Sequence, residues 1–570
     1  MRFPFLMRVL LFSVFVVCLT AVCLATEAQR FTDTATTRSA IQQWILQLGD
    51  ESFLVRQRAE SLLIHSGIRA HPELQRARQS RDLEIARRAE YVLSQIEQTF
   101  LDTENRAVAL WVRWYIEAPH QASKAQIIWA LADPTLDHTR GEGLHTLCRF
   151  VRFEESDALR LEAAKTLIAY PPVSPLLRQQ WYQYIWDNFR EAGENDLFQT
   201  LAHYAKLWCD LDEADDKTTP ELQNRVRQVS ADTLRLLERP ENAVQVGSGV
   251  DIMLHYAVAE LQDATGLIED RDAVVAAALA VQPGPIQTTE ALLPVGDHRD
   301  LSMYEHYHAG SCLRLRFRLR WATAHFHKVI ETGDVVLRVA ASRQVAEIAL
   351  YFADYAVAAA FYDKHMEILD SPDYRREHNP DRQLAQAQKS KLYALAENAK
   401  ADENWESVRE YLTQAWSVPN APLEISDIDL VILTYQLCRR HPEVVFEFRN
   451  RLEPALRQLW KSIVDTHESG PIESRMEKMP ITCNIAAWLL ANTEGDYDSA
   501  LTLVEAALKI EPDDASILDT LAHVYFLGGK IDEAIRVQEE VVRLAPEATI
   551  FRQVLERFQQ AGETETNSVP

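Results

Sequence analysis

Glycine and cysteine are scarce in this chain of 570 residues, which contains 17 glycines and 7 cysteines. Two of the cysteines, Cys18 and Cys23, fall in the apolar start of the chain, and the others are widely separated. No CxxC pair is present, so the sequence indicates neither a disulfide framework nor a cysteine-based zinc, haem or redox site. We expect the remaining thiols to be small buried hydrophobic residues.

Motifs of common enzymes are missing as well. The sequence contains no GxGxxG or GxxxxGK[ST] phosphate loop, no HExxH and no GxSxG. The stretch VQVGSGV has Val246 where the first glycine of GxSxG should stand. We therefore expect no catalytic residue, no cofactor and no enzyme activity; an enzyme built on helical repeats without a known motif is one alternative.

Positive charge is in deficit, since 59 Lys and Arg residues face 84 Asp and Glu residues, for a formal net charge of -25. An acidic surface repels polyanions, so nucleic acid is not expected as a partner. Basic or apolar segments of other proteins suit this charge better.

Long apolar runs are absent after the first residues of the chain. The run from Val9 to Ala25 follows two arginines and precedes further small residues, which is typical of an export signal. We predict a signal peptide over residues 1–28, cleaved after Ala25 or Ala28, with an uncleaved membrane anchor as the alternative. The protein is therefore expected in the periplasm or cell envelope, with membrane contact only through a retained anchor.

Two stretches near the C-terminus repeat one pattern at a spacing of 34 residues: EGDYDSALTLVEAALKIEPDD (494–514) and GGKIDEAIRVQEEVVRLAPEA (528–548). A glycine between two apolar-periodic segments and a closing proline describe a pair of helices. The pattern resembles the tetratricopeptide repeat, and the matching residues are Leu518, Leu521, Ala522, Tyr525, Gly529, Ala534 and Pro546. Two clear repeats are predicted over residues 481–548, the first with one extra loop residue and Trp488 in its first helix.

Weaker copies of the pattern extend upstream and predict degenerate tetratricopeptide-like repeats over residues 251–470. Their matching residues are Ala259, Gly266, Ala278, Gly310, Ala322, Phe326, Ala346, Tyr355, Ala358, Tyr362, Ala396, Trp405 and Ala415. Arg271 and Val408 stand where the pattern prefers alanine. The segment 427–459 reads as one more helical pair without clear repeat residues.

The N-terminal third has another rhythm, in which Asp50 and Asp82 precede Arg56 and Arg87. This pattern resembles HEAT-type helical repeats, which we predict over residues 38–190, with aspartate and arginine tying neighbouring helix pairs together. A helical connector with an acidic loop is expected over 191–250 and a disordered tail over 561–570. An export signal followed by both repeat types is similar to exported tetratricopeptide proteins of planctomycete-type bacteria.

Almost no segment alternates polar and apolar residues at the strand period, so the fold class is all-α: a solenoid of stacked helix pairs, HEAT-like and then tetratricopeptide-like. Such a solenoid favours a non-enzymatic scaffold or adaptor that binds a partner segment on its concave side. The repeat register places eight residues there: Arg343, Glu347, Tyr393, Glu397, Asn484, Trp488, Asp519 and His523. A simpler interpretation of this set is that its polar residues are only solvated and that Trp488 packs in the core.

Histidines suggest a metal-binding alternative, because His298, His306, His308, His325 and His327 lie close in sequence. Residues two apart on a helix point in different directions, which disfavours the HxH pairs as ligands. His308 and Cys312 have the spacing of four that one helix face requires, so a metal-binding envelope protein stays the second alternative. The acidic stretch 210–221 lacks the glycine of a calcium loop, and no metal ligand is assigned.

Overall fold

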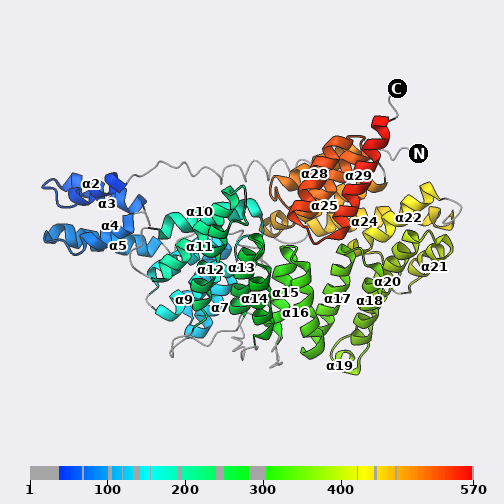
Figure 1. Cartoon of the computed structure of the whole chain (residues 1–570), viewed down its shortest axis with the longest axis horizontal. Helices are drawn as coiled ribbons and strands as arrows, with labels where there is room; N and C mark the ends of the chain where they lie inside the picture. Colours follow the sequence, from blue (N-terminus) through cyan, green and yellow to red (C-terminus); the bar gives the residue numbers. More distant parts are fainter. Residues whose placement is uncertain are drawn as a thin grey trace. The chain divides into compact units, whose positions relative to one another are not determined.

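The computed structural model describes residues 38–567 except 67–69, 100–105, 119, 133–141, 155, 191–195, 239–248, 282–302, 420–421, 442–445, 469–471 and 494. These residues form α-helices and short 3₁₀ turns, with no strand among them (Figure 1). Successive helices pack against each other as pairs, and the pairs stack along the chain. The chain is therefore an all-α solenoid, as predicted.

No helix in the described part of the chain has both the length and the apolar character needed to cross a bilayer. The predicted signal peptide, residues 1–28, and His298 lie outside the described residues.

Contacts divide the chain into two compact units, Phe31–His298 and Arg299–Pro570. The helices of the first unit are α2 (Arg38–Gln47), α3 (Phe53–Ser66), α4 (His71–Ala77), α5 (Leu83–Thr99), α6 (Arg106–Glu117), α7 (Gln121–Ala130), α8 (Glu142–Phe153), α9 (Asp157–Ala169), α10 (Pro175–Phe189), α11 (Asp196–Glu213), α12 (Pro220–Arg235), α13 (Gly249–Ala264) and α14 (Ile268–Ala280). The pair α13–α14, which opens the segment predicted as tetratricopeptide-like, lies in this first unit.

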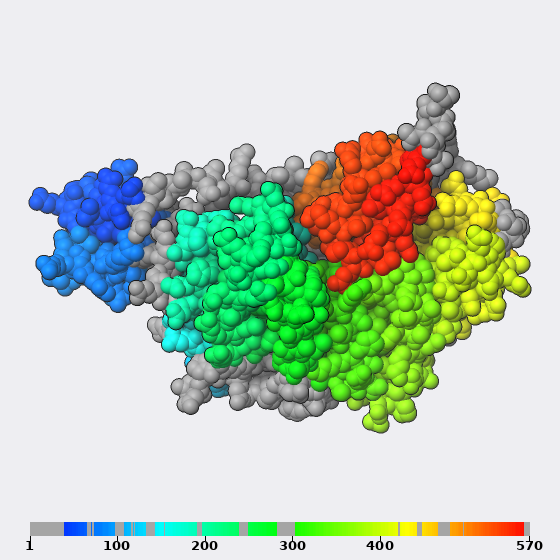
Figure 2. All heavy atoms as spheres, in the orientation of Figure 1, coloured from blue at the N-terminus to red at the C-terminus, as the bar shows by residue number. Residues whose placement is uncertain are grey.

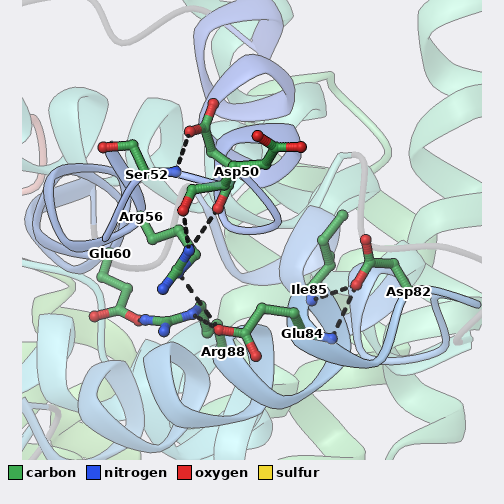
Figure 3. A network of polar contacts seen from close by, with 9 residues as sticks. Asp50, Ser52, Arg56, Glu60, Asp82, Glu84, Ile85 and Arg88 are labelled. Carbon is green, nitrogen blue, oxygen red and sulfur yellow. Dashed lines mark hydrogen bonds and ion pairs between the residues drawn. The ribbon is translucent and has the colours of Figure 1, made fainter. Parts of the chain in front are cut away.

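Charged side chains join α3 to α5 at the start of the first unit (Figure 3). Arg88 of α5 pairs with Glu60 of α3 and with Glu84 of its own helix. Arg56 of α3 also approaches α5, with its Nε 3.5 Å from Glu84 Oε1. The two helices are therefore tied by arginine–glutamate pairs, with one arginine from each helix.

The aspartates predicted to make these ties have a different role. Asp82 Oδ1 accepts hydrogen bonds from two backbone N–H groups at the start of α5, at 2.9 and 3.3 Å (Figure 3). Asp50 Oδ1 accepts one from the backbone of Ser52 just before α3, at 2.8 Å, and Arg87 is exposed. A short aspartate side chain is favoured at a helix N-terminus, where it meets free N–H groups, so the longer glutamates reach across instead.

A buried ion triad connects α9 to α13. Lys165 is fully buried, and its Nζ lies 2.7 Å from Glu162 Oε1 and 2.9 Å from Asp251 Oδ1. Glu162 is also buried and Asp251 is partly exposed, so Lys165 without these carboxylates would be a buried unpaired charge. The triad therefore fixes how these two helices pack.

The acidic stretch 210–221, predicted as a loop of the connector, is half helical. Asp210 and Asp212 lie in the last turn of α11, and the loop itself is only residues 214–219. Asp210 is held by Lys206, with Nζ at 2.7 Å from its Oδ1, and by Arg225 of α12. These cations offset the unfavourable placing of carboxylates at a helix C-terminus.

The second unit contains α15 (Tyr304–Leu315), α16 (Leu319–Thr332), α17 (Val335–Tyr351), α18 (Tyr355–Leu369), α19 (Pro372–Arg375), α20 (Asp381–Ala401), α21 (Trp405–Ala415), η2 (Ile425–Asp427), α22 (Ile428–Arg440), η3 (Phe446–Phe448), α24 (Arg449–Glu468), α25 (Ile472–Thr493), α26 (Tyr497–Leu508), α27 (Ala515–Leu527), α28 (Ile531–Leu544) and α29 (Thr549–Asn567). Helix α29 extends through residues 561–567, where a disordered tail was predicted.

The pairs share one turn, in which a residue with positive φ follows the first helix. Gly266, Phe317, Ala353, Glu403 and Gly529 have φ values of 72°, 54°, 54°, 52° and 79°. In each case the next backbone N–H donates to the carbonyl five residues earlier, at 2.8–2.9 Å. This is the hydrogen bond of a Schellman helix end, which favours glycine at the left-handed position. The same turn therefore recurs in both units, with and without glycine.

The C-terminal helices return to the first pairs of the second unit. Phe551 at the start of α29 packs against Phe317 and Tyr351, with ring centroids 5.9 and 6.0 Å apart. Glu547 accepts a hydrogen bond of 2.8 Å from the backbone N–H of Arg320 in α16. Figure 2 shows the orange and red atoms of this region directly against the green atoms of the first pairs. The row of helix pairs in this unit therefore curves back until its last helix meets its beginning.

Candidate partner-binding face of the C-terminal repeats

The eight predicted contact residues all lie on first helices of the pairs of the second unit: α17, α20, α25 and α27. We call the row formed by these helices together with α22, which lies between α20 and α25, the first-helix face. Side-chain contacts join α15 to α17, and α22 through α25 to α27, as described below. The face includes residues of intermediate exposure as well as exposed ones.

At α17 the predicted residues form an ion network. Arg343 Nε donates to Glu347 Oε1 at 2.8 Å, and the other oxygen of Glu347 lies 3.1 Å from Nη2 of Arg314 on α15. The Arg343 side chain is 62% exposed, so its guanidinium keeps donors free for a ligand. Glu347 is shared between two arginines and acts chiefly as their anchor.

At α20 the face is aromatic and acidic. Tyr393 is partly exposed, and burial followed by the charges of Glu397 and Asp429 raises the pKa of its hydroxyl. Glu397 is 8% exposed and pairs with Lys400 one turn later on the same helix. Tyr355 at the start of α18 also has its pKa raised by burial and then by the same two carboxylates. These four groups therefore share one region.

The link from α22 to α27 runs through Trp488. Its indole Nε1 donates to Asp429 Oδ1 of α22 at 3.1 Å, and its ring meets the ring of His523 edge-on at 4.8 Å between centroids. Ala487 and Ala522, the residues just before Trp488 and His523, are both fully buried. Trp488 and His523 therefore occupy equivalent positions in successive repeats. This is the alignment given by the sequence, in which the first repeat has one extra loop residue.

His523 and Asp519 are engaged by the protein itself. Arg557 Nη2 of α29 lies 3.0 Å from His523 Nε2, and because a guanidinium only donates, Nε2 is the acceptor. The imidazole proton then sits on Nδ1, which donates to the Asp519 carbonyl at 2.9 Å, and burial lowers the pKa of this histidine. Asp519 Oδ1 accepts from Gln538 at 2.9 Å. These two residues position their neighbours and offer little to a ligand.

Asn484 lies one turn before Trp488 on α25. Its Oδ1 is buried without a hydrogen-bond partner, although the residue itself is partly exposed. A polar atom in this situation is costly unless something outside the described chain bonds to it.

Sequence reasoning missed Asp429, Tyr355 and Tyr362 as members of this region. Tyr362 lies on α18, and burial raises its pKa to about 12. Asp429 belongs to the helical pair that carries no clear repeat residues, so it could not be placed in the register. The only signal was one aspartate ahead of the otherwise apolar LVIL stretch.

The histidines form contacts other than those expected for a metal site. His306 and His325, on α15 and α16, are fully buried, with their Nδ1 atoms 2.8 Å apart. The predicted pair His308 and Cys312 lies on one face of α15, with Sγ 3.6 Å from Nε2. Within the described residues, no group of three His, Cys, Asp or Glu side chains is placed to hold a metal ion.

Comparison with known proteins finds one family. Residues 491–557 match the tetratricopeptide repeat. The curated proteins contain no match. Among solved structures, the chain is similar to one titled "Crystal structure of APC/C hetero-tetramer Cut9-Hcn1", at 13% identity and a TM-score of 0.27, covering 96% of this chain and 89% of that one. It is also similar to "Human IFIT1 dimer with m7Gppp-AAAA", at 13% identity and a TM-score of 0.20, covering 89% and 99%.

At these TM-scores, the likeness to either structure carries no information about function. The family match covers α26, α27 and α28 with the adjoining parts of α25 and α29. It contains the two glycine turns at Gly495 and Gly529 from which the repeat was first recognised. Residues 491–557 are therefore tetratricopeptide repeats, placed at the C-terminal end of an all-α solenoid.

Proposed function

We propose that this protein is a non-enzymatic scaffold of the cell envelope, and that its second unit binds an extended or helical segment of another protein on the first-helix face. Helical solenoids present long surfaces on which such a segment can lie. The observation that carries the proposal is the continuous row of aromatic and acidic side chains from Tyr393 through Asp429 to Trp488. Aromatic groups supply contact area, and carboxylates favour a basic partner.

Only part of the predicted site has enough exposed surface to contact a partner. Arg343, Tyr393, Asp429 and Trp488 keep exposed surface, whereas His523 is only 6% exposed beneath α29. The proposed binding surface therefore runs along α17, α20, α22 and α25. The envelope location rests on the apolar start of the sequence and is proposed on that ground alone.

Affinity capture from envelope extract, followed by binding measurements with the purified partner, tests this function. Tyr393→Ala removes a partly exposed aromatic side chain from the first-helix face, and Glu367→Ala removes a side chain that is 70% exposed on the second helix α18. We expect the first variant to weaken binding and the second to leave it unchanged, with circular dichroism showing both folded. Equal binding by both variants would contradict the proposed surface.

A further inference from the structure

Two aspartates at the start of α22 have opposite environments. Asp427 is 2% exposed, and its Oδ2 lies 3.0 Å from Lys389 Nζ. Asp429, two residues later, is exposed, and no Lys, Arg or His of the described chain pairs with it. Asp427 is therefore neutralised by the fold, while the charge of Asp429 is not.

The Asp429 carboxylate is nevertheless held in one orientation. Trp488 Nε1 donates to its Oδ1 at 3.1 Å, and no other described residue donates to this side chain. The indole is itself fixed against His523, whose Nε2 accepts from Arg557. One carboxylate oxygen is thus used for positioning, and Oδ2 is left for a donor from outside.

The surroundings of Asp429 suit a cation. Glu397 is near enough for its charge to raise the pKa of the Asp429 carboxyl, after the larger effect of burial. The charge of Asp429 in turn contributes to the raised pKa of the Tyr393 and Tyr355 hydroxyls, after the larger effect of burial. The neighbouring cation, Lys400, is already paired with Glu397. Aromatic rings beside a carboxylate favour ammonium and guanidinium groups, whose alkyl stems pack on the rings.

On balance the folded state disfavours the ionised form of Asp429, because burial and the charge of Glu397 raise the carboxyl pKa more than the hydrogen bond from Trp488 lowers it. Its side chain keeps exposed surface, so a group from outside can reach it. A carboxyl with a raised pKa in the folded state destabilises that state at neutral pH. Residues that cost stability in this way are commonly kept for binding.

We infer that Asp429 accepts the ammonium or guanidinium group of one lysine or arginine in the partner segment, with Tyr393 beside its stem and Trp488 as a positioning residue. This inference rests on the proposed function and narrows its partner to a segment with a basic residue at that register. The bound cation pairs with the Asp429 carboxylate and offsets the unfavourable charge of Glu397 near it.

Selection of a phage-displayed library of linear random peptides against the full chain tests this assignment. We expect the enriched peptides to share a lysine or arginine. Asp429→Asn keeps a carbonyl oxygen for Trp488 and removes the charge, and it should weaken a selected peptide about tenfold or more. Norleucine in place of the peptide's basic residue should cause a similar loss in the wild type and little further loss in Asp429→Asn. Asp373→Asn, at a carboxylate 75% exposed on α19, is the matched control and should bind as the wild type does.

The outcomes separate the two proposals. No enriched peptide would overturn both the scaffold function and the Asp429 assignment. Peptides that lose affinity with Tyr393→Ala but are indifferent to Asp429→Asn would leave the scaffold function standing and overturn the assignment. The unfolding temperature gives an independent readout, because Asp429→Asn should leave it equal or higher. A clear decrease would show that the carboxylate is a structural group, and it would overturn the assignment.

Discussion

Replacing Gly529 with alanine is expected to destabilise the last repeat, and replacing Glu403 with glycine is expected to stabilise the α20–α21 repeat. Gly529 has a φ of 79°, and an added Cβ would meet no atom within 4 Å. The whole effect therefore comes from the backbone. A residue with a side chain costs about 1–2 kcal/mol in this conformation, and alanine recovers about 0.4–1 kcal/mol by restricting the unfolded chain. The net cost is about 1 kcal/mol.

Glu403 has a φ of 52° and already bears the conformational cost, so Glu403→Gly should change stability by about the same amount in the opposite direction. Asp402→Gly is the matched control. Its φ of -87° is ordinary, so glycine at that position brings only the entropy penalty and should destabilise.

Hydrogen exchange followed by mass spectrometry measures both effects locally, which suits a chain with more than one unit. A change of 1 kcal/mol corresponds to about a fivefold change in the local opening constant. Peptides of α27–α28 should exchange faster in Gly529→Ala, and peptides of α20–α21 more slowly in Glu403→Gly. Destabilisation by both Glu403→Gly and Asp402→Gly to the same extent would refute the shared-turn account.

Three further predictions concern buried contacts and pH. Lys165→Met should cost about 3–5 kcal/mol, because the buried Glu162 and the partly exposed Asp251 lose their cation; a calorimetric change of less than about 1 kcal/mol would contradict the triad. Phe551→Ala should cost about 3–5 kcal/mol and speed hydrogen exchange in α29 and at the Phe317 turn, and unchanged exchange there would contradict the closure of the unit. Burial lowers the pKa of His325, so the unfolded chain binds more protons and stability should fall as pH decreases from about 7 to 5. The fall in melting temperature should be smaller in His325→Asn, and an equal fall would contradict this.

The sequence was sufficient for the fold class and for the two clear repeats, because helical periodicity and glycine–proline punctuation are local signals. Gly529 and Gly495 marked their turns directly. Phe317, Ala353 and Glu403 adopt the same left-handed turn, yet nothing in their chemistry announces it. Tertiary packing imposes that conformation on them, so these repeats could be recognised only by their small residues.

The candidate site was predictable only in part, for a similar reason. The register placed Trp488 next to His523 correctly, because residues at one position of successive repeats form a row. That α29 would cover His523 depends on where the last helix docks, which no local pattern specifies. Asp429 was missed because its helix lacks repeat residues, although it completes the acidic and aromatic row.

The claim that a partner segment lies on the first-helix face is tested most directly by site-specific photocrosslinking. A photoreactive phenylalanine at position 343, where the native side chain is 62% exposed, and one at position 367 on the second helix would each be presented to a selected basic peptide. We predict crosslinking from position 343 and none from position 367. Crosslinking from position 367 alone would contradict the account.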